Sequence, residues 1–152
     1  MKVIFTSSNL PLALAIRFMT GCKWHHCGVI YNDDLVIEAS AIKGVRGVPL
    51  DDFKSRGDFV IIDVPTQDEQ ASQEFLFRQL TKGYDWAGAL GYPFRLDWQN
   101  KDKWYCSELV AIAAKRGKSP IVRNDVRSVT PRDIWIQRFE IIETNDRKLN
   151  LG

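Results

Sequence analysis

The stretch CGVIYNDDLVIEAS, residues 27–40, predicts a β-hairpin that decides the fold class of this chain. Its two apolar runs, CGVIY and LVIEAS, flank the triplet Asn32-Asp33-Asp34, whose residue types favour a tight turn. If the chain reverses direction there, residues near Gly28 lie opposite Glu38. A slip of one residue would move every side chain to the other face, so this register is the expectation that matters most.

Apolar patterns on both sides of the hairpin predict the remaining elements. We expect strands over 2–6, 45–49, 58–64 and 139–143, and helices over 11–20, 67–82, 106–116 and just after Thr130. Thr66 and Glu69 have capping-box spacing for the second helix, and Asp85 could begin a helical turn within 84–94. These elements predict an α+β fold, a small and mostly antiparallel sheet packed by helices. We expect one domain over 1–152, with a frayed tail at 144–152.

Composition limits the class of protein. The chain has 152 residues, of which 45% are hydrophobic and 26% charged, as in one compact globular domain. A formal charge of +2 is too mild to indicate nucleic acid as a partner. The basic stretch 115–132 fits either a solvated surface or a docking patch.

Location is predicted from three features of the sequence. Arg17 and the polar residues 7–9 interrupt the N-terminal apolar run, although MTGC loosely resembles a lipoprotein cleavage site. No run of residues approaches the length of a membrane span. Three cysteines cannot all pair within one chain, which fits a reducing compartment. We therefore expect a cytoplasmic protein.

Cys106 is the first candidate for chemistry, because it precedes the helix predicted for CSELVAIAAKRG. The unpaired N–H groups and the positive dipole end of a helix start stabilise a thiolate, and the same N–H groups can hold an oxyanion. A single cysteine before an apolar helix is also a common core residue, so this signal needs support from elsewhere in the chain.

The only two histidines, His25 and His26, supply that support, since a thiolate nucleophile requires an imidazole as its proton carrier. Side chains alternate along a strand, so at most one of the two faces a given cleft, and Cys27 faces away from His26. Glu38 is the only ionisable side chain of its apolar strand, and a buried carboxylate needs a partner. The hairpin register brings Glu38 within a residue or two of His26, where it could orient the imidazole.

Other interpretations stay open. Cys22, His25, His26 and Cys27 could be zinc ligands, but the pattern lacks a second ligand pair. We expect no metal and no cofactor.

For the substrate wall we predict Tyr84, Trp86 and Tyr105, with Trp24 and Trp104 as equally placed alternatives.

At this point the residues resemble a known family. WHHCGVIY is similar to the Ser-His-Val-Gly strand of NlpC-type papain-like cysteine peptidases, with His26 as the family histidine, and YCSELV is similar to its helix start. The histidine precedes the cysteine here, which resembles the circularly permuted YiiX/YaeF-like branch of bacterial, phage and poxvirus proteins. Glu38 matches the polar residue of that branch's triad. Three further stretches also resemble sequences of that branch: FMTGCKWHH, YDW at 84–86 and VTPRDI at 129–134.

The resemblance implies a permuted papain-like fold and a thiol hydrolase with Cys106, His26 and Glu38 as its triad. It implies amidase or peptidase activity on a peptide, an acyl-amide or a lipid-like substrate, and the family also contains acyl-transferring relatives. Two positions depart from its pattern: Cys27 replaces a small aliphatic residue, and Glu108 replaces the glycine of the peptidoglycan-cutting branch. A non-catalytic binding or host-interaction module with a papain-like cleft is the alternative.

Overall fold

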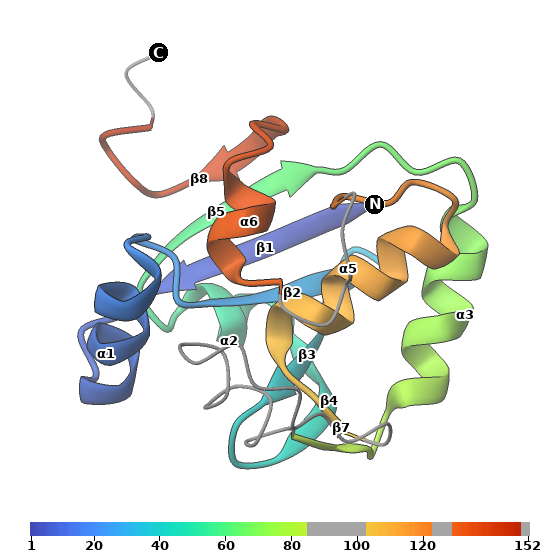
Figure 1. Cartoon of the computed structure of the whole chain (residues 1–152), viewed down its shortest axis with the longest axis horizontal. Coiled ribbons are helices and arrows are strands. Elements are labelled where there is room, and N and C mark those ends of the chain that lie inside the picture. The colour runs from blue at the N-terminus through green and yellow to red at the C-terminus, as the bar shows by residue number, and fades with distance from the viewer. Residues whose placement is uncertain (85–102, 123–128, 150–152) are drawn as a thin grey trace.

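A six-stranded antiparallel sheet is the frame of the computed structural model, which describes residues 1–84, 103–122 and 129–149 (Figure 1). The strand order is β4-β3-β2-β1-β5-β8, so the strand nearest the N-terminus lies inside the sheet. The strands are β1 (Lys2–Ser7), β2 (His26–Tyr31), β3 (Leu35–Ser40), β4 (Gly44–Pro49), β5 (Asp58–Asp63) and β8 (Glu140–Thr144). The predicted α+β class is confirmed.

The hairpin of β2 and β3 turns where the sequence predicted. Asn32 and Asp33 adopt positive φ angles of 51° and 59°, which their short polar side chains tolerate. Gly28 pairs with Glu38 across the two strands, so the predicted register is confirmed. Because alternate residues share a face, His26 and Glu38 lie on one face of the sheet, while Cys27 belongs to the core on the other.

Helices cover both faces of the sheet. The helices on one face are α3 (Glu69–Gln79), α5 (Cys106–Arg116) and α6 (Pro131–Trp135), which can be followed across the front of Figure 1. The core on this face contains alternate sheet residues such as Phe5 and Val29 together with Leu109 and Val110 of α5. The short α2 (Leu50–Lys54) contributes Phe53 to a smaller core on the opposite face. The helix α1 (Pro11–Thr20) projects from one end of the sheet.

Three local expectations need correction. The helix α3 starts after Asp68 rather than Thr66, because the Asp68 carboxylate accepts the Ala71 N–H at 3.0 Å. Thr66 instead donates its hydroxyl to the Val64 carbonyl. The chain leaves α3 after Gln79 and adopts a positive φ of 73° at Thr81, so the predicted end near 82 was too late.

Residues 144–149, predicted as part of a frayed tail, make several contacts with the rest of the structure. Asn145 accepts the Phe59 N–H at 2.7 Å, which extends the pairing of β8 with β5. Asp146 is 8% exposed and accepts from Lys23 at 2.8 Å. Leu149 packs against the main core. These contacts hold the segment to the sheet.

Short elements complete the description. β6 (Gly83–Tyr84) and β7 (Lys103–Trp104) form a parallel pair, and α2 was not predicted from the sequence. The expected helical turn near Asp85 lies outside the described residues. Within 1–84, 103–122 and 129–149, we find no helix with the length and apolar character of a membrane span.

Candidate active site

The β2–β3 hairpin places an imidazole against a buried carboxylate. His26 begins β2, and its Nε2 atom lies 2.6 Å from Oε2 of Glu38, which is only 1% exposed. Gly28 lies between them on the same face, and a Cβ there would meet Val36 Cγ1 at 2.6 Å and Glu38 Cβ at 3.5 Å. The absence of a side chain at Gly28 therefore leaves room for Val36, which lets β3 pack closely beside β2 next to Glu38.

Two arginines complete the environment of Glu38. Arg56 donates to both carboxylate oxygens, at 2.6 and 3.0 Å, and Arg46 donates through Nε at 3.0 Å and Nη2 at 2.8 Å. Arg46 comes from β4, where it pairs directly with Glu38, and Arg56 follows α2. Burial alone would raise the pKa of the Glu38 carboxyl, but the contacts with His26 and Arg56 outweigh it and hold that pKa well below its usual range. Glu38 is therefore a carboxylate at neutral pH.

Phe53 of α2 closes this arrangement into a ring of contacts. Its ring stacks on the His26 imidazole with centroids 5.6 Å apart, and the Arg56 guanidinium lies 4.5 Å from its centroid. His26 and Arg56 thus share both an aromatic neighbour and a carboxylate. This restricts the orientation of the His26 ring.

The helix α5 delivers Cys106 to the sheet. Cys106 is its first residue and is 6% exposed, and α5 packs against β2 and β3. Ser107 donates its hydroxyl to the Val129 carbonyl at 2.6 Å, which ties the helix start to the segment before α6. As predicted, Leu109, Val110, Ala113 and Ala114 are buried.

Cys106 sits where its thiolate is stabilised. The thiol of Cys27 donates to the Cys106 sulfur, and this contact, together with the charge and hydrogen bond of His26, overcomes burial and lowers the pKa of Cys106 well below that of an ordinary thiol. Burial opposes the charged imidazole of His26, but the Cys106 thiolate and Glu38 raise its pKa to about 9. Both shifts favour a thiolate at Cys106 beside an imidazolium at His26.

His25 is in a different state from its neighbour. Burial and the positive charge of His26 lower its pKa to about 4, so its imidazole is neutral under ordinary conditions. Its Nδ1 atom is buried and has no hydrogen-bond partner among the described residues. Only one of the two adjacent histidines thus has both a carboxylate partner and a thiolate partner.

Sequence comparison gives the family. Residues 2–124 match the model described as "Permuted papain-like amidase enzyme, YaeF/YiiX, C92 family". The chain belongs to this amidase family. The match covers both the β2–β3 hairpin and the start of α5, which supply the residues described above.

Structural comparison supports the same fold for this family member. The model aligns with the crystal structure of the metalloprotein YiiX from Escherichia coli O157:H7 with a TM-score of 0.71. The two chains share 19% identity over 94% of this chain and 95% of the other. No curated protein sequence matches this chain. The predicted resemblance to the permuted papain-like fold is confirmed.

The described residues do not form a metal site like the one weighed from the sequence. Within 1–84, 103–122 and 129–149, no three side chains of His, Cys, Asp or Glu are grouped to hold a metal ion. Cys27 belongs to the core on the side of the sheet opposite Glu38 and Phe53. Among the described residues, His26 contacts Glu38 and the Cys106 sulfur.

Only part of the predicted substrate wall lies within the described residues. Trp86 and the side chain of Tyr84 lie outside the described residues. Tyr105 is 8% exposed, and burial raises the pKa of its hydroxyl, which contacts the backbone of Val129. Its position favours packing over substrate contact. Trp24 is 1% exposed and packs with Phe5 and Trp135, so it is a core residue.

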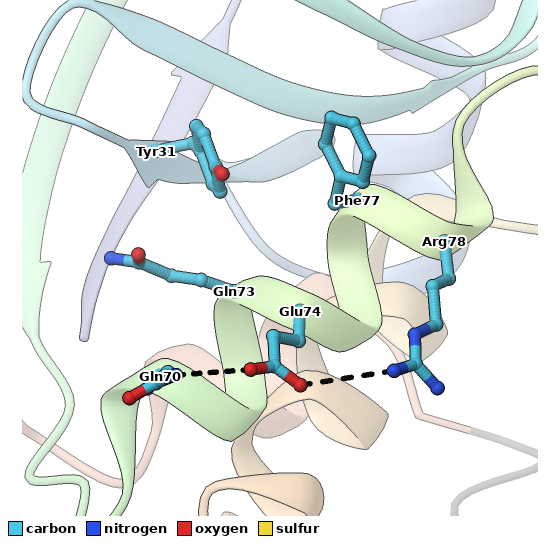
Figure 2. A pocket seen from close by; sticks show the side chains of 6 residues that line it. All are labelled: Tyr31, Gln70, Gln73, Glu74, Phe77 and Arg78. Carbon is cyan, nitrogen blue, oxygen red and sulfur yellow. Dashed lines mark hydrogen bonds and ion pairs between the residues drawn. The ribbon is translucent and has the colours of Figure 1, made fainter.

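A hollow of about 410 Å³ lies at the other end of β2, between Tyr31 and the outer side of α3 (Figure 2). Its polar side chains form a surface ladder in which Gln70 donates to Glu74 at 3.1 Å and Arg78 lies 3.8 Å from Glu74. The described residues that line the hollow include no cysteine, serine or histidine, and Tyr31 is five residues along β2 from His26, about 16 Å in an extended strand. It does not belong to the site at Cys106.

Sequence reasoning missed four contributors to the site. Arg46 and Arg56 gave no local signal, although a buried carboxylate requires cationic partners and both arginines are near it in sequence. Phe53 belongs to a helix that was not predicted. Cys27 was treated as a neutral replacement for an aliphatic residue, whereas its thiol contacts Cys106.

Proposed function

We propose that this family member is a cysteine hydrolase that cleaves an amide bond, with Cys106 as nucleophile, His26 as proton carrier and Glu38 as the group that orients His26. The proposal rests on the position of Cys106 at the start of α5, on its hydrogen bond with His26, and on the 2.6 Å contact between His26 and Glu38. The substrate classes that fit are peptides and acyl-amides.

The first half of the reaction follows from this pair. The Cys106 thiolate attacks the carbonyl carbon, a C–S bond forms, and the carbonyl electron pair moves onto oxygen. The imidazolium of His26 then donates its proton to the amide nitrogen as the C–N bond breaks. The amine leaves and a thioester remains on Cys106.

The second half restores the enzyme. The neutral His26 accepts a proton from water, the resulting hydroxide attacks the thioester carbon, and the C–S bond breaks. The acid leaves, Cys106 is again a thiolate and His26 is again an imidazolium. Glu38 stays ionised throughout, because its carboxylate is bound by Arg46 and Arg56 in addition to His26.

The helix start supports the developing oxyanion. The N–H groups of the first turn of a helix have no partners within it, and they coincide with the positive end of the helix dipole. An oxyanion formed beside Cys106 would lie close to these groups. The low exposure of Cys106 excludes much of the water that would compete with these interactions.

The test uses a panel of peptide, acyl-amide and acyl-ester substrates with three proteins: wild type, Cys106→Ala and Cys22→Ala. Cys22 is a second free cysteine, partly exposed, and burial raises its pKa, so it provides a matched control. We expect turnover in wild type and Cys22→Ala and none in Cys106→Ala. Amide turnover that persists in Cys106→Ala would refute the proposal.

A binding module that keeps the cleft is the second candidate. It would need neither a thiolate nor an ionised imidazole, and the buried Glu38 would add cost without function. Absence of turnover across the panel, together with ordinary thiol reactivity at Cys106, would favour this candidate over the hydrolase.

A further inference from the structure

The helix α1 exposes an apolar surface that the core does not use. Only Ala13 and Thr20 of its ten residues are buried. The large exposed side chains are Leu12 at 52%, Leu14 at 47%, Phe18 at 90% and Met19 at 49%, and Leu10 before the helix is 67% exposed. Single exposed apolar residues are normal, but a contiguous group of this kind marks an interaction surface.

The exposed positions form one continuous face. At 3.6 residues per turn, residues 11, 12, 14, 15, 18 and 19 span about 160° of the helix circumference. All six are apolar, and the single charged residue of the helix, Arg17, lies on the remaining side. We call the exposed residues Leu10, Pro11, Leu12, Leu14, Ala15, Phe18 and Met19 the α1 face.

Basic side chains flank both ends of the α1 face. Arg17 donates to the Ser8 carbonyl at 3.2 Å and to Asn9 Oδ1 at 3.4 Å, near the helix start. Arg132 donates to the Thr20 carbonyl at 3.4 Å, at the helix end. These acceptors are neutral oxygens, so among the described residues both guanidinium charges remain available to an anion.

The segment of sequence that contains α1 has no acidic residue. From Met1 to Asn32 there is no acidic residue. Lys23, which follows the helix, is bound by Asp58 at 2.7 Å and Asp146 at 2.8 Å and adds no free charge. An apolar face with arginines at both ends matches a lipid surface, where acyl chains meet anionic headgroups.

We propose that the α1 face docks on an anionic lipid surface. The apolar side chains enter the boundary between headgroups and acyl chains, while Arg17 and Arg132 bind lipid phosphates at either end. Charge favours this occupant over a second copy of the chain, because two copies of a face flanked by arginines would repel each other. The proposal is independent of the chemistry at Cys106, and Cys106→Ala is expected to dock as wild type does.

Vesicle sedimentation tests the proposal. Wild type is mixed with vesicles of phosphatidylcholine alone and of phosphatidylcholine with phosphatidylglycerol, beside a Leu14→Asp/Phe18→Asp variant and a Phe77→Asp control. Phe77 is a matched control because it is 61% exposed on α3, away from α1. We expect wild type and Phe77→Asp to bind the anionic vesicles at least tenfold better than the neutral ones, and the α1 variant to lose at least tenfold of that binding.

A second pair of variants tests the proposal even if the aspartate variant fails to fold. Phe18→Trp and Phe77→Trp keep an aromatic side chain at each position, and brominated anionic lipids quench tryptophan that enters the bilayer. We expect additional quenching only in Phe18→Trp. Three results would overturn the proposal: no wild-type binding to anionic vesicles, equal loss in Phe77→Asp, or a wild-type dimer that the α1 variant converts to monomer.

Discussion

Nε2 of His26 lies 2.6 Å from Oε2 of Glu38, a carboxylate that two arginines also bind. Glu38 therefore faces three cationic groups while its side chain is 1% exposed. Glu38 therefore both raises the pKa of His26 and restricts the orientation of its ring.

Replacing His26 should remove most of the low-pH reactivity of Cys106. The imidazolium is one of the groups that stabilise the thiolate, so His26→Ala should slow alkylation of Cys106 at about pH 6 on the order of tenfold or more. His25→Ala is the matched control, since His25 is neutral and should be replaceable with little loss. Iodoacetamide labelling with peptide mapping measures both, and a larger loss in His25→Ala would reverse the assignment.

Each arginine should contribute to stability through Glu38. Arg46→Met and Arg56→Met each remove charged hydrogen bonds to a buried carboxylate, so each should lower the free energy of unfolding by about 1.5 to 3 kcal/mol. Arg78→Met, which removes an exposed ion pair with Glu74, should cost less than about 1 kcal/mol. Urea denaturation measures the three values. Equal losses in all three variants would show that Arg46 and Arg56 do not act through burial of Glu38.

Neutralising Glu38 should be costly in a pH-dependent way. Glu38→Gln leaves two guanidiniums without a counter-charge, a loss on the order of 3 to 5 kcal/mol at neutral pH. The folded-state pKa of Glu38 lies below the ~4.3 of an unfolded glutamate, so its stabilisation is complete above about pH 5 and decreases as pH falls through the folded pKa. The stability difference between wild type and Glu38→Gln should shrink on acidification, and a constant difference would contradict the ionised state.

The thiol of Cys27 should tune Cys106. Cys27→Val removes the S–H donor with little change in volume, so the pKa of Cys106 should rise and its alkylation at about pH 6 should slow. The fold should be retained, because the site of Cys27 is a buried apolar core. Thermal unfolding checks the fold, and alkylation rates over a pH series check the shift. An unchanged rate would show that Cys27 only fills space.

Local patterns were sufficient to predict the parts of the site that lie on single elements. The turn at Asn32 and Asp33 fixed the hairpin register, and the register alone placed Glu38 beside His26. Cys106 was predictable because an apolar helix follows it directly. Each of these predictions depended on residues close together in the sequence.

Contacts between distant elements could not be predicted in the same way. Arg46 reaches Glu38 only because β4 pairs with β3 in a particular register, and Arg56 only because α2 returns the chain across that face. Tyr105 also contacts the backbone of Val129, which is far along the chain. The ordered residues after Thr144 depend on β8 joining the sheet edge at β5. These contacts can be predicted only once the pairing of the strands in the complete sheet is known.

The pH dependence of Cys106 alkylation in the wild-type protein tests the central claim most directly. Labelling with iodoacetamide from about pH 4 to about pH 10, with peptide mapping of Cys22, Cys27 and Cys106, gives one profile for each thiol. We predict that Cys106 is modified first, already reacts as a thiolate at about pH 6, and changes again near pH 9 as His26 loses its proton. A Cys106 profile rising only near the ~8.5 of a free thiol, or earlier modification of Cys22, would contradict the account.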